Sequence, residues 1–285
     1  MKKLNSVKMI FALLLVLAMI FGLCACKMTS EEESTAAAAI QSQTQQAEIT
    51  EAAQAGGTET ITDGDKTIIY PLEIKNSQNS YPVIAWANGT GCNTESYTAL
   101  LEELANGGYI VIADASTMTA DGTAQIDSID YIINQNGDSS SIFYNKVDTE
   151  SIGVCGHSQG GRSCINAAQA DARIRCVVSI AGASSAEEAS GLTAPSLFLT
   201  GTNDLVVVSS RWCKPSYDAV AGRAAYASLD GGIHTTCMVS PKKVSDYALS
   251  WFDAYLKGDS DAKAVFEDDG KLAHDYDWKD FENKN

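Results

Sequence analysis

The sequence has few of the residues that build a metal or cofactor site. It contains three histidines among 285 residues, and its eight cysteines form no Cys-x-x-C pair. None of the Cys and His positions has a spacing typical of a zinc site. We therefore expect neither a metal ion nor a cofactor.

Basic residues are also scarce. The chain has 20 Lys and Arg against 36 Asp and Glu, which gives a formal net charge of −16 at pH 7. Nucleic acids and anionic lipid headgroups attract basic surfaces, so an acidic chain does not seek them electrostatically. This balance argues against a nucleic-acid partner, and the absence of any fixed internal period argues against a repeat architecture.

Long hydrophobic runs are missing too. The run Met9–Leu23 is 15 residues long and follows Lys2, Lys3 and Lys8, whereas a membrane-spanning helix needs about 20 apolar residues. A basic start followed by an apolar stretch of this length predicts a secretory signal peptide over residues 1–25. An uncleaved N-terminal anchor and plain secretion are the alternatives.

The next residues, LCAC, place Leu23 three positions before Cys26 and Ala25 directly before it. This pattern resembles the lipobox of bacterial lipoproteins, which implies that Cys26 carries lipid at the extracytoplasmic face of the membrane. Cys24 fits less well, because bulky Leu23 would precede it. Residues 26–60 are rich in Ala, Gln, Ser, Thr and Glu, cannot bury enough surface to fold alone, and predict a disordered tether.

The remaining residues, 61–285, suffice for one domain with a sizeable core, and we expect a monomer. Of its six cysteines, Cys155 and Cys176 lie in apolar runs and are expected to be buried. Three others fall in predicted loops: Cys92, Cys213 and Cys237. Export permits disulfides, so a bridge between two of these three is one possibility, whose pairing the sequence does not determine.

Apolar, β-branched runs alternate with helical patterns along this domain. The strand candidates are residues 67–74, 82–88, 109–115, 151–156, 174–181, 196–201 and 224–230. The helix candidates are residues 94–106, 122–136, 159–169, 210–221 and 241–257. Continuously apolar strands separated by helices predict an α/β domain with a mainly parallel central sheet and helices on both faces. Catalytic groups are then expected at the carboxyl ends of the strands.

Residues 153–161 read GVCGHSQGG. Gly156, Ser158 and Gly160 follow the G-x-S-x-G pattern of a strand-to-helix elbow that presents a nucleophilic serine. A serine held in such a strained turn is crowded by neighbours two residues away, which glycine relieves, and Gly161 lets the helix approach the sheet. Ser158 follows a predicted strand and opens a predicted helix, so we expect it to be the nucleophile.

A serine hydroxyl needs a base within hydrogen-bond reach. His157 adjoins the serine, and its side chain is expected to point away from it. His274 lies in the acidic tail, whereas His234 follows the last predicted strand in a loop with two glycines. We expect His234 to be the base, so activity should fall as acid protonates it.

The base needs a carboxylate that orients it. Asp204 directly follows the predicted strand 196–201, whereas its rival Asp230 precedes His234 on the same loop. Asp114 ends an earlier strand and is expected to be structural. The order Ser158, Asp204, His234 is the order found in α/β-hydrolases.

Two backbone N–H groups are expected to form an oxyanion hole. One belongs to Gln159, directly after the nucleophile at a helix N-terminus, and its side chain is not the donor. The other is assigned to Thr90, in the loop GTGCN that follows the predicted strand 82–88. An ordinary turn is the alternative interpretation of this loop.

With these residues in order, the whole folded domain from about Tyr70 resembles the bacterial polyester hydrolases: cutinases and poly(ethylene terephthalate) hydrolases within the chlorophyllase and dienelactone-hydrolase-like group. The motifs that carry the resemblance are residues 144–161, 194–207, 214–220 and 229–237. The resemblance implies an α/β-hydrolase fold, a Ser158 acyl-enzyme and an ester substrate.

Several positions depart from that family's pattern. Gln159 replaces the usual methionine, and Ala183 and Thr90 stand where the relatives have cleft aromatics. By the resemblance, Trp212, Val206 and Ala183 line the substrate cleft. The loss of two aromatic walls argues against aromatic polyesters as substrates.

Only 14 residues separate the predicted strands 174–181 and 196–201, which leaves no room for a cap domain. An open, shallow cleft of this kind would admit bulky or polymer-borne esters. Two other functions use the same fold: a peptidase-type serine hydrolase, and a catalytically silent lipoprotein that binds a ligand at the cell envelope.

Overall fold

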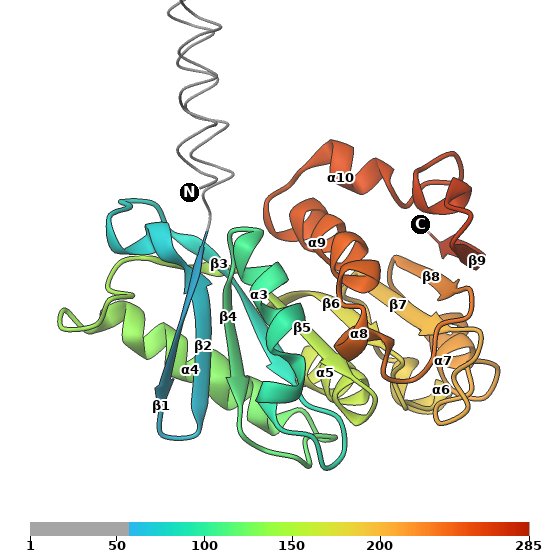
Figure 1. Cartoon of the computed structure of the whole chain (residues 1–285), viewed down its shortest axis with the longest axis horizontal. Helices are drawn as coiled ribbons and strands as arrows, with labels where there is room; N and C mark the ends of the chain where they lie inside the picture. The colour runs from blue at the N-terminus through green and yellow to red at the C-terminus, as the bar shows by residue number, and fades with distance from the viewer. Residues whose placement is uncertain (1–56, 285) are drawn as a thin grey trace, which may run out of the picture. The chain divides into compact units, whose positions relative to one another are not determined.

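A nine-stranded sheet organises the part of the chain that the structure, a computed structural model, describes: residues 57–284 (Figure 1). The spatial order of the strands is β1-β2-β4-β3-β5-β6-β7-β8-β9. Their bounds are β1 Thr58–Asp63, β2 Lys66–Pro71, β3 Tyr81–Ala87, β4 Ile110–Asp114, β5 Val147–His157, β6 Ile174–Ile180, β7 Ser196–Gly201, β8 Ala224–Leu229 and β9 Trp278–Lys284. The six strands from β4 to β8 pair in parallel, and antiparallel strands β1, β2 and β9 extend the two edges.

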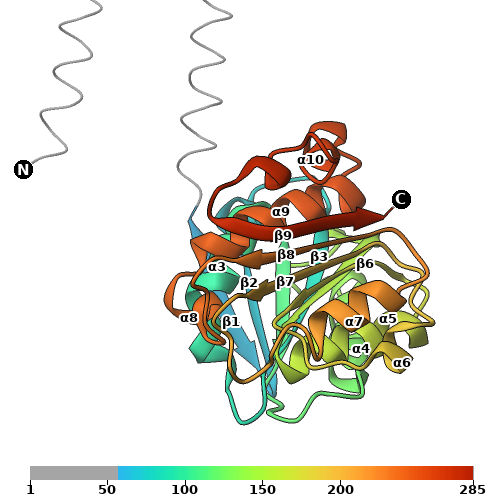
Figure 2. The same cartoon turned by 90° about the vertical axis from the view of Figure 1, so that its right-hand side faces the viewer.

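Helices cover both faces of this sheet. One face carries α3 (Thr98–Asn106), α8 (Thr236–Val239) and α9 (Lys242–Leu256), and the other carries α4 (Thr123–Gly137), α5 (Gln159–Ala170), α6 (Ala186–Ala189) and α7 (Cys213–Ala219). Figure 2 shows α9 on one side of β7 and β8, and α5 and α7 on the other. The remaining short helices are η1 Leu72–Lys75, η2 Thr94–Tyr97, α10 Ser260–Ala264 and η3 Leu272–His274. With both faces covered, every residue of β4, β7 and β8 is buried.

Over residues 57–284 this architecture is the expected α/β-hydrolase fold, without a cap domain. The connection from β6 to β7 holds only the four-residue helix α6. All seven expected strands are present. The expected helix 241–257 is present as α9, which buries a stripe of apolar side chains between Val244 and Leu256. The helix expected over residues 210–221 is shorter in the structure and covers only Cys213–Ala219.

The two outermost strands were not expected. β1 begins at Thr58, so the folded domain starts a few residues before the expected boundary at residue 61. Both β1 and β9 are edge strands with largely exposed or half-buried residues, which leaves them without a strong apolar pattern. The expected signal peptide, the expected lipidation site Cys26 and nearly all of the expected tether lie outside the described residues. Within residues 57–284, no helix has the length and hydrophobicity to cross a membrane.

The possible disulfide between two of the cysteines is not formed in the described domain. All six in the described domain are free, so no disulfide joins two of Cys92, Cys213 and Cys237. Cys213 lies in α7, within the expected helix 210–221, and Cys237 lies in α8 rather than in a loop; both are buried. They belong to apolar clusters on opposite faces of the sheet, so they cannot approach each other. Cys155 and Cys176 are buried, as expected.

Candidate active site

The residues singled out in the sequence lie at one edge of the sheet. Thr90 follows β3, Ser158 follows β5, Asp204 follows β7 and His234 follows β8. These strands are parallel, so their carboxyl ends meet at the same edge. The fold therefore gathers at this edge the groups that a serine hydrolase needs.

Ser158 occupies a strained turn between β5 and α5. Its φ is 58° and its ψ is −118°, a conformation that L-residues rarely adopt. The chain after β6 holds the turn in place. The Ser158 N–H donates to the carbonyl of Ile180 (2.9 Å), and the Ser158 carbonyl accepts from the N–H of Ala183 (3.0 Å).

The glycines beside Ser158 are required by backbone contacts. A Cβ atom at Gly156 would lie 2.3 Å from the carbonyl oxygen of Gly160. A Cβ atom at Gly160 would lie 2.0 Å from the carbonyl oxygen of Ala87 in β3. Both contacts are with backbone that cannot rotate away, so the G-x-S-x-G spacing is a condition for forming the elbow.

A buried carboxylate orients the histidine. Asp204 Oδ2 lies 2.8 Å from His234 Nδ1, and Asp204 Oδ1 accepts the N–H groups of Val206 (2.9 Å) and Val207 (2.8 Å). The Asp204 side chain is 0% exposed and that of His234 is 15% exposed. Because a carboxylate only accepts, the neutral imidazole carries its proton on Nδ1, which leaves Nε2 free to accept one.

Backbone hydrogen bonds join the Asp204 loop to the His234 loop. The Asn203 N–H donates to the carbonyl of Gly232 (2.9 Å), and the Gly231 N–H donates to Thr202 Oγ1 (2.8 Å). Asp230, the rival acid, lies elsewhere: its carboxylate is 3.8 Å from Lys279 Nζ. The hydrogen bond to His234 is thus made by Asp204.

Ser158 is half-buried. Among residues 57–284 its hydroxyl makes no hydrogen bond, to His234 or to any other group. Catalytic hydrogen bonds of this kind are often long in a substrate-free enzyme and shorten when substrate binds. The rings of His157, next to the serine, and His234 have centroids 4.5 Å apart, so the base lies next to the elbow.

The two expected oxyanion donors have no acceptor within the described chain. Gln159 is the first residue of α5, so its N–H has no helical partner, and the N–H of exposed Thr90 also makes no internal hydrogen bond. Both groups can therefore bind the oxygen of a substrate. The dipole of α5 adds positive potential at Gln159.

Asn88, fully buried just before the Thr90 loop, fixes where that loop begins. Its side-chain amide donates to the carbonyls of Asp114 (2.9 Å) and Ser116 (3.1 Å), and its own carbonyl accepts from Thr119 Oγ1 (3.0 Å). Asp114 is held in turn by a buried ion pair with Lys66. Asp114 is thus structural, as the sequence predicts, and it supports the end of β3.

The side chain of Gln159 makes a contact that the sequence did not reveal. Its side-chain oxygen accepts the N–H of Thr119 (2.8 Å), which ties the loop after β4 to the nucleophile elbow. The methionine expected here from the resemblance would offer this N–H only a weakly accepting thioether sulfur. Met118, 68% exposed, lies beside the Gln159 amide.

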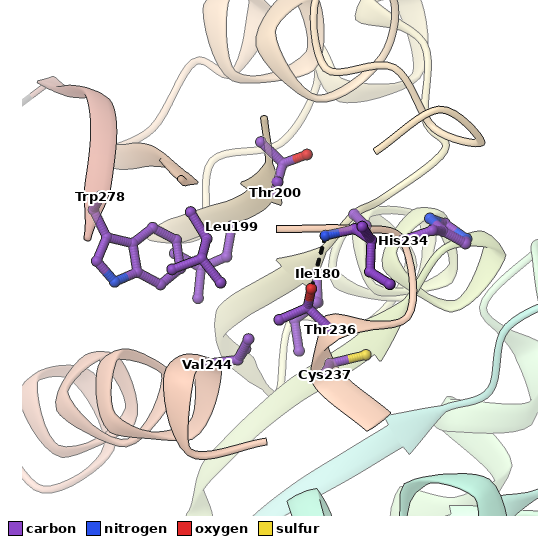
Figure 3. Close-up of a pocket in the computed structure, with 12 residues that line it drawn as sticks. Ile180, Leu199, Thr200, His234, Thr236, Cys237, Val244 and Trp278 are labelled. Carbon is purple, nitrogen blue, oxygen red and sulfur yellow. Dashed lines mark hydrogen bonds between the residues drawn. The ribbon is translucent and has the colours of Figure 1, made fainter. Parts of the chain in front are cut away.

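Behind His234 lies a small apolar cavity of about 20 Å³. Figure 3 shows Trp278, Val244 and Cys237 reaching it from β9, α9 and α8. The dashed line in Figure 3 is the hydrogen bond from the Ile233 N–H to Thr236 Oγ1 (2.8 Å). Apolar packing and this bond support the histidine loop from inside.

The outer rim of the site is aliphatic. Leu205 is 88% exposed, Val206 68% and Ile233 50%, all directly beside Asp204 or His234. Ala183 and Trp212, the other residues expected at the cleft, are half-buried and pack against the α7 side of the core. In residues 57–284 no cluster of three or more His, Cys, Asp or Glu could hold a metal ion.

The side chain of His157 was expected only to point away from Ser158, but it contacts the loop that carries His234. Its ring is 2% exposed, with Nε2 2.8 Å from the carbonyl oxygen of His234 and Nδ1 3.0 Å from the Tyr97 hydroxyl. Burial, together with the neighbouring His234, lowers the pKa of His157 to about 4. No local pattern in the sequence could have shown this, because the partners lie 60 and 77 positions away.

The sequence of the chain is similar to those of known ester hydrolases. Residues 33–273 match the family model described as PET hydrolase-like. The chain is 26% identical over 204 residues to cutinase est2 of Thermobifida alba, which covers 69% of this chain and 66% of that protein. It is 25% identical to a cutinase of Thermobifida fusca (62% of that protein) and 22% identical to a bis(hydroxyethyl) terephthalate hydrolase of Streptomyces coelicolor (64% of that protein), each over 69% of this chain. The matched region spans about two thirds of the length of these relatives.

Proposed function

The chain belongs to the PET hydrolase-like family of ester hydrolases, and on that premise we propose that it is a serine carboxylic-ester hydrolase acting through an acyl-enzyme on Ser158. The observation that carries the proposal is the 2.8 Å hydrogen bond between His234 Nδ1 and the fully buried Asp204, on loops beside a serine with φ 58°. Catalysis by a serine hydrolase needs a buried carboxylate, a partly exposed imidazole and a strained serine together. A binding protein needs none of these three groups.

In the first half of the proposed reaction, Ser158 Oγ attacks the ester carbonyl carbon and its proton passes to His234 Nε2. The negative charge that develops on the carbonyl oxygen is bound by the N–H groups of Gln159 and Thr90. The tetrahedral intermediate then collapses and the C–O bond to the alcohol breaks. The alcohol leaves with the proton from His234, and the acyl group remains on Ser158.

In the second half, water attacks the acyl-enzyme while His234 takes its proton. The intermediate collapses again, and Ser158 Oγ regains the proton as the carboxylic acid leaves. Asp204 stays ionised throughout and stabilises the imidazolium that forms in each half. The overall change is one ester and one water converted to one acid and one alcohol.

We propose that the substrates are aliphatic esters, either small or borne on a polymer. No cap covers the site, and the rim residues Leu205, Val206 and Ile233 offer aliphatic surface to an acyl chain. Ala183 and Thr90 provide no ring against which an aromatic acyl group could stack. The relatives are named as cutinases and as a terephthalate-ester hydrolase, so both substrate types belong in the assay.

The test compares the full chain with Ser158→Ala on p-nitrophenyl esters from C2 to C12. We expect a loss of roughly 10⁴-fold or more in kcat for the variant, since removal of a nucleophile leaves only residual catalysis. Ser190→Ala, at an exposed serine, is the matched control and should match wild type. A fluorophosphonate should label Ser158. A folded protein that turns over no ester and resists the probe would contradict the proposal and favour the peptidase or binding alternatives.

We further propose that the enzyme is a monomer that acts at the extracytoplasmic face of the membrane, held by lipid on Cys26 through the tether. Cells grown with an alkyne-tagged fatty acid should yield a labelled protein. Cys26→Ala should abolish the label, and the matched control Cys24→Ala should retain it. Label that persists in Cys26→Ala would overturn this assignment.

A further inference from the structure

We propose that His157 is a positioning residue that, through Tyr97, holds the oxyanion loop (residues 88–91) and the histidine loop (residues 230–236) in fixed relation to the nucleophile. The proposal rests on the proposed esterase function, because it concerns the geometry of that reaction.

Three hydrogen bonds form a continuous path between the two loops. The Gly89 N–H donates to the Tyr97 hydroxyl oxygen (3.1 Å), Tyr97 is paired with His157 Nδ1 (3.0 Å), and His157 Nε2 is paired with the carbonyl oxygen of His234 (2.8 Å). Tyr97 is 1% exposed and His157 2% exposed, so water does not compete for these bonds.

Only one arrangement of protons satisfies this path in its neutral form. The His234 carbonyl can only accept, so His157 Nε2 carries the ring proton and Nδ1 is an acceptor. The Tyr97 hydroxyl therefore donates to Nδ1, and its oxygen lone pair accepts the Gly89 N–H. The Tyr97 hydroxyl donates one bond and accepts another, and each other polar group has one partner on the path, which makes the path directional and specific.

Packing shows independently that this path is tight. A Cβ atom at Gly89 would lie 2.9 Å from the Tyr97 hydroxyl and 3.1 Å from His157 Nδ1. The ring centroids of Tyr97 and His157 are 5.7 Å apart, and those of His157 and His234 are 4.5 Å apart. A residue larger than glycine at position 89 would push the oxyanion loop away from the elbow.

The path joins the groups that must act together. The proposed donor Thr90 is one residue from Gly89, Ser158 is one residue from His157, and the carbonyl at the far end belongs to the proposed base His234. A shift in either loop would therefore change the position of a reacting group relative to Ser158. A displacement of 1 Å in such a site costs on the order of 10² in rate.

The charge state of His157 supports this function. Burial, and next the nearby His234, lower the pKa of His157 to about 4, although Asp204 and the hydrogen bond to the His234 carbonyl act in the opposite direction. Burial also raises the pKa of the Tyr97 hydroxyl. The proton arrangement is thus the same across the pH range in which a histidine base works, and no second positive charge faces the imidazolium formed during catalysis.

The experiment measures kcat and KM of the full chain on p-nitrophenyl butyrate, per active site counted by fluorophosphonate titration. For His157→Phe, which keeps a ring but removes both hydrogen bonds, we expect kcat about 100-fold lower with KM within about threefold. Tyr97→Phe removes one oxygen atom and should lower kcat about tenfold. Should His157→Phe not fold, Tyr97→Phe carries the test.

Two further variants separate positioning from general stability. In His157→Gln, the side-chain N–H₂ lies near the former Nε2 and can restore the bond to the His234 carbonyl, so we expect kcat to recover about tenfold relative to His157→Phe. Tyr109→Phe is the matched control, because Tyr109 is a buried tyrosine whose hydroxyl bonds Asp253 Oδ1 (2.7 Å) away from this site. It should lower Tm and leave kcat unchanged.

The outcomes are distinct. An active wild type whose kcat per site is unchanged in His157→Phe and Tyr97→Phe would overturn the positioning proposal and leave the esterase function standing. A folded wild type that hydrolyses no ester would overturn both. We expect kcat to fall in His157→Phe and Tyr97→Phe and to recover in part in His157→Gln. The kcat of Tyr109→Phe should equal that of wild type.

Discussion

Replacing Asp204 by asparagine changes one atom of the site and keeps its shape. Asp204 Oδ1 accepts two backbone N–H groups, from Val206 at 2.9 Å and Val207 at 2.8 Å. An asparagine must place its oxygen toward those two donors, because turning its N–H₂ group there would set donor against donor. Its N–H₂ group therefore faces His234 Nδ1.

This orientation forces the wrong tautomer on the base. Facing a donor, His234 Nδ1 must become an acceptor, so the ring proton moves to Nε2 and His234 can no longer take the proton of Ser158. The imidazolium also loses the carboxylate 2.8 Å away that would stabilise it. Such a change typically costs about 10⁴ in kcat, which corresponds to about 5 kcal/mol of transition-state stabilisation.

The assay is kcat on p-nitrophenyl butyrate, corrected for the folded fraction by circular dichroism. Asp230→Asn is the matched control, since its carboxylate lies on the neighbouring loop and faces Lys279 at 3.8 Å. It should retain activity within about twofold, as expected for an exposed ion pair. The assignment of the acid would be wrong if Asp204→Asn kept more than about a tenth of wild-type kcat. It would also be wrong if Asp230→Asn lost more kcat than Asp204→Asn.

Three other perturbations follow from the same contacts. Asp114→Ala leaves buried Lys66 with only exposed Asp65 as an anionic partner, at 3.4 Å, so urea titration should show a loss of about 3 kcal/mol, much of it restored by adding Lys66→Met. Gly160→Ala places a Cβ atom 2.0 Å from a backbone carbonyl and should abolish activity in any folded fraction, as labelling by a fluorophosphonate would report. His157 has a folded-state pKa lowered from 6.5 to about 4, so the unfolded chain binds the proton first as pH falls. Stability from this group should be complete above pH 6.5 and decline by about 3 kcal/mol down to pH 4, and urea titrations of His157→Phe should show a correspondingly smaller decline.

The central part of the fold could be predicted because its signals are local. Each buried parallel strand is a continuous apolar run, and the stripe on α9 repeats every three or four residues. The edge strands gave no such signal. β1 reads TETITD and pairs with one neighbour only, so half of its backbone and most of its side chains face solvent, and its sequence resembles that of the preceding polar segment.

The same distinction applies to the site. The grouping of Ser158, Asp204 and His234 could be predicted because each lies in the segment after a buried strand, and parallel strands end at one edge. Contacts between loops had no counterpart in sequence order. The free state of Cys92 and the bond from Gln159 to Thr119 both depend on which loops meet after folding.

Within residues 57–284 no cap lies between β6 and β7, so the site obtains its rigidity from its own loops. Here the acid loop is bonded to the histidine loop by Asn203 and Gly232 as well as by the Asp204–His234 pair. The oxyanion loop is bonded from one side through Asn88 and from the other through Tyr97. Preorganised donors cost no reorganisation during a reaction, so under the proposed esterase function these cross-links would hold the catalytic groups in place while bulky esters bind.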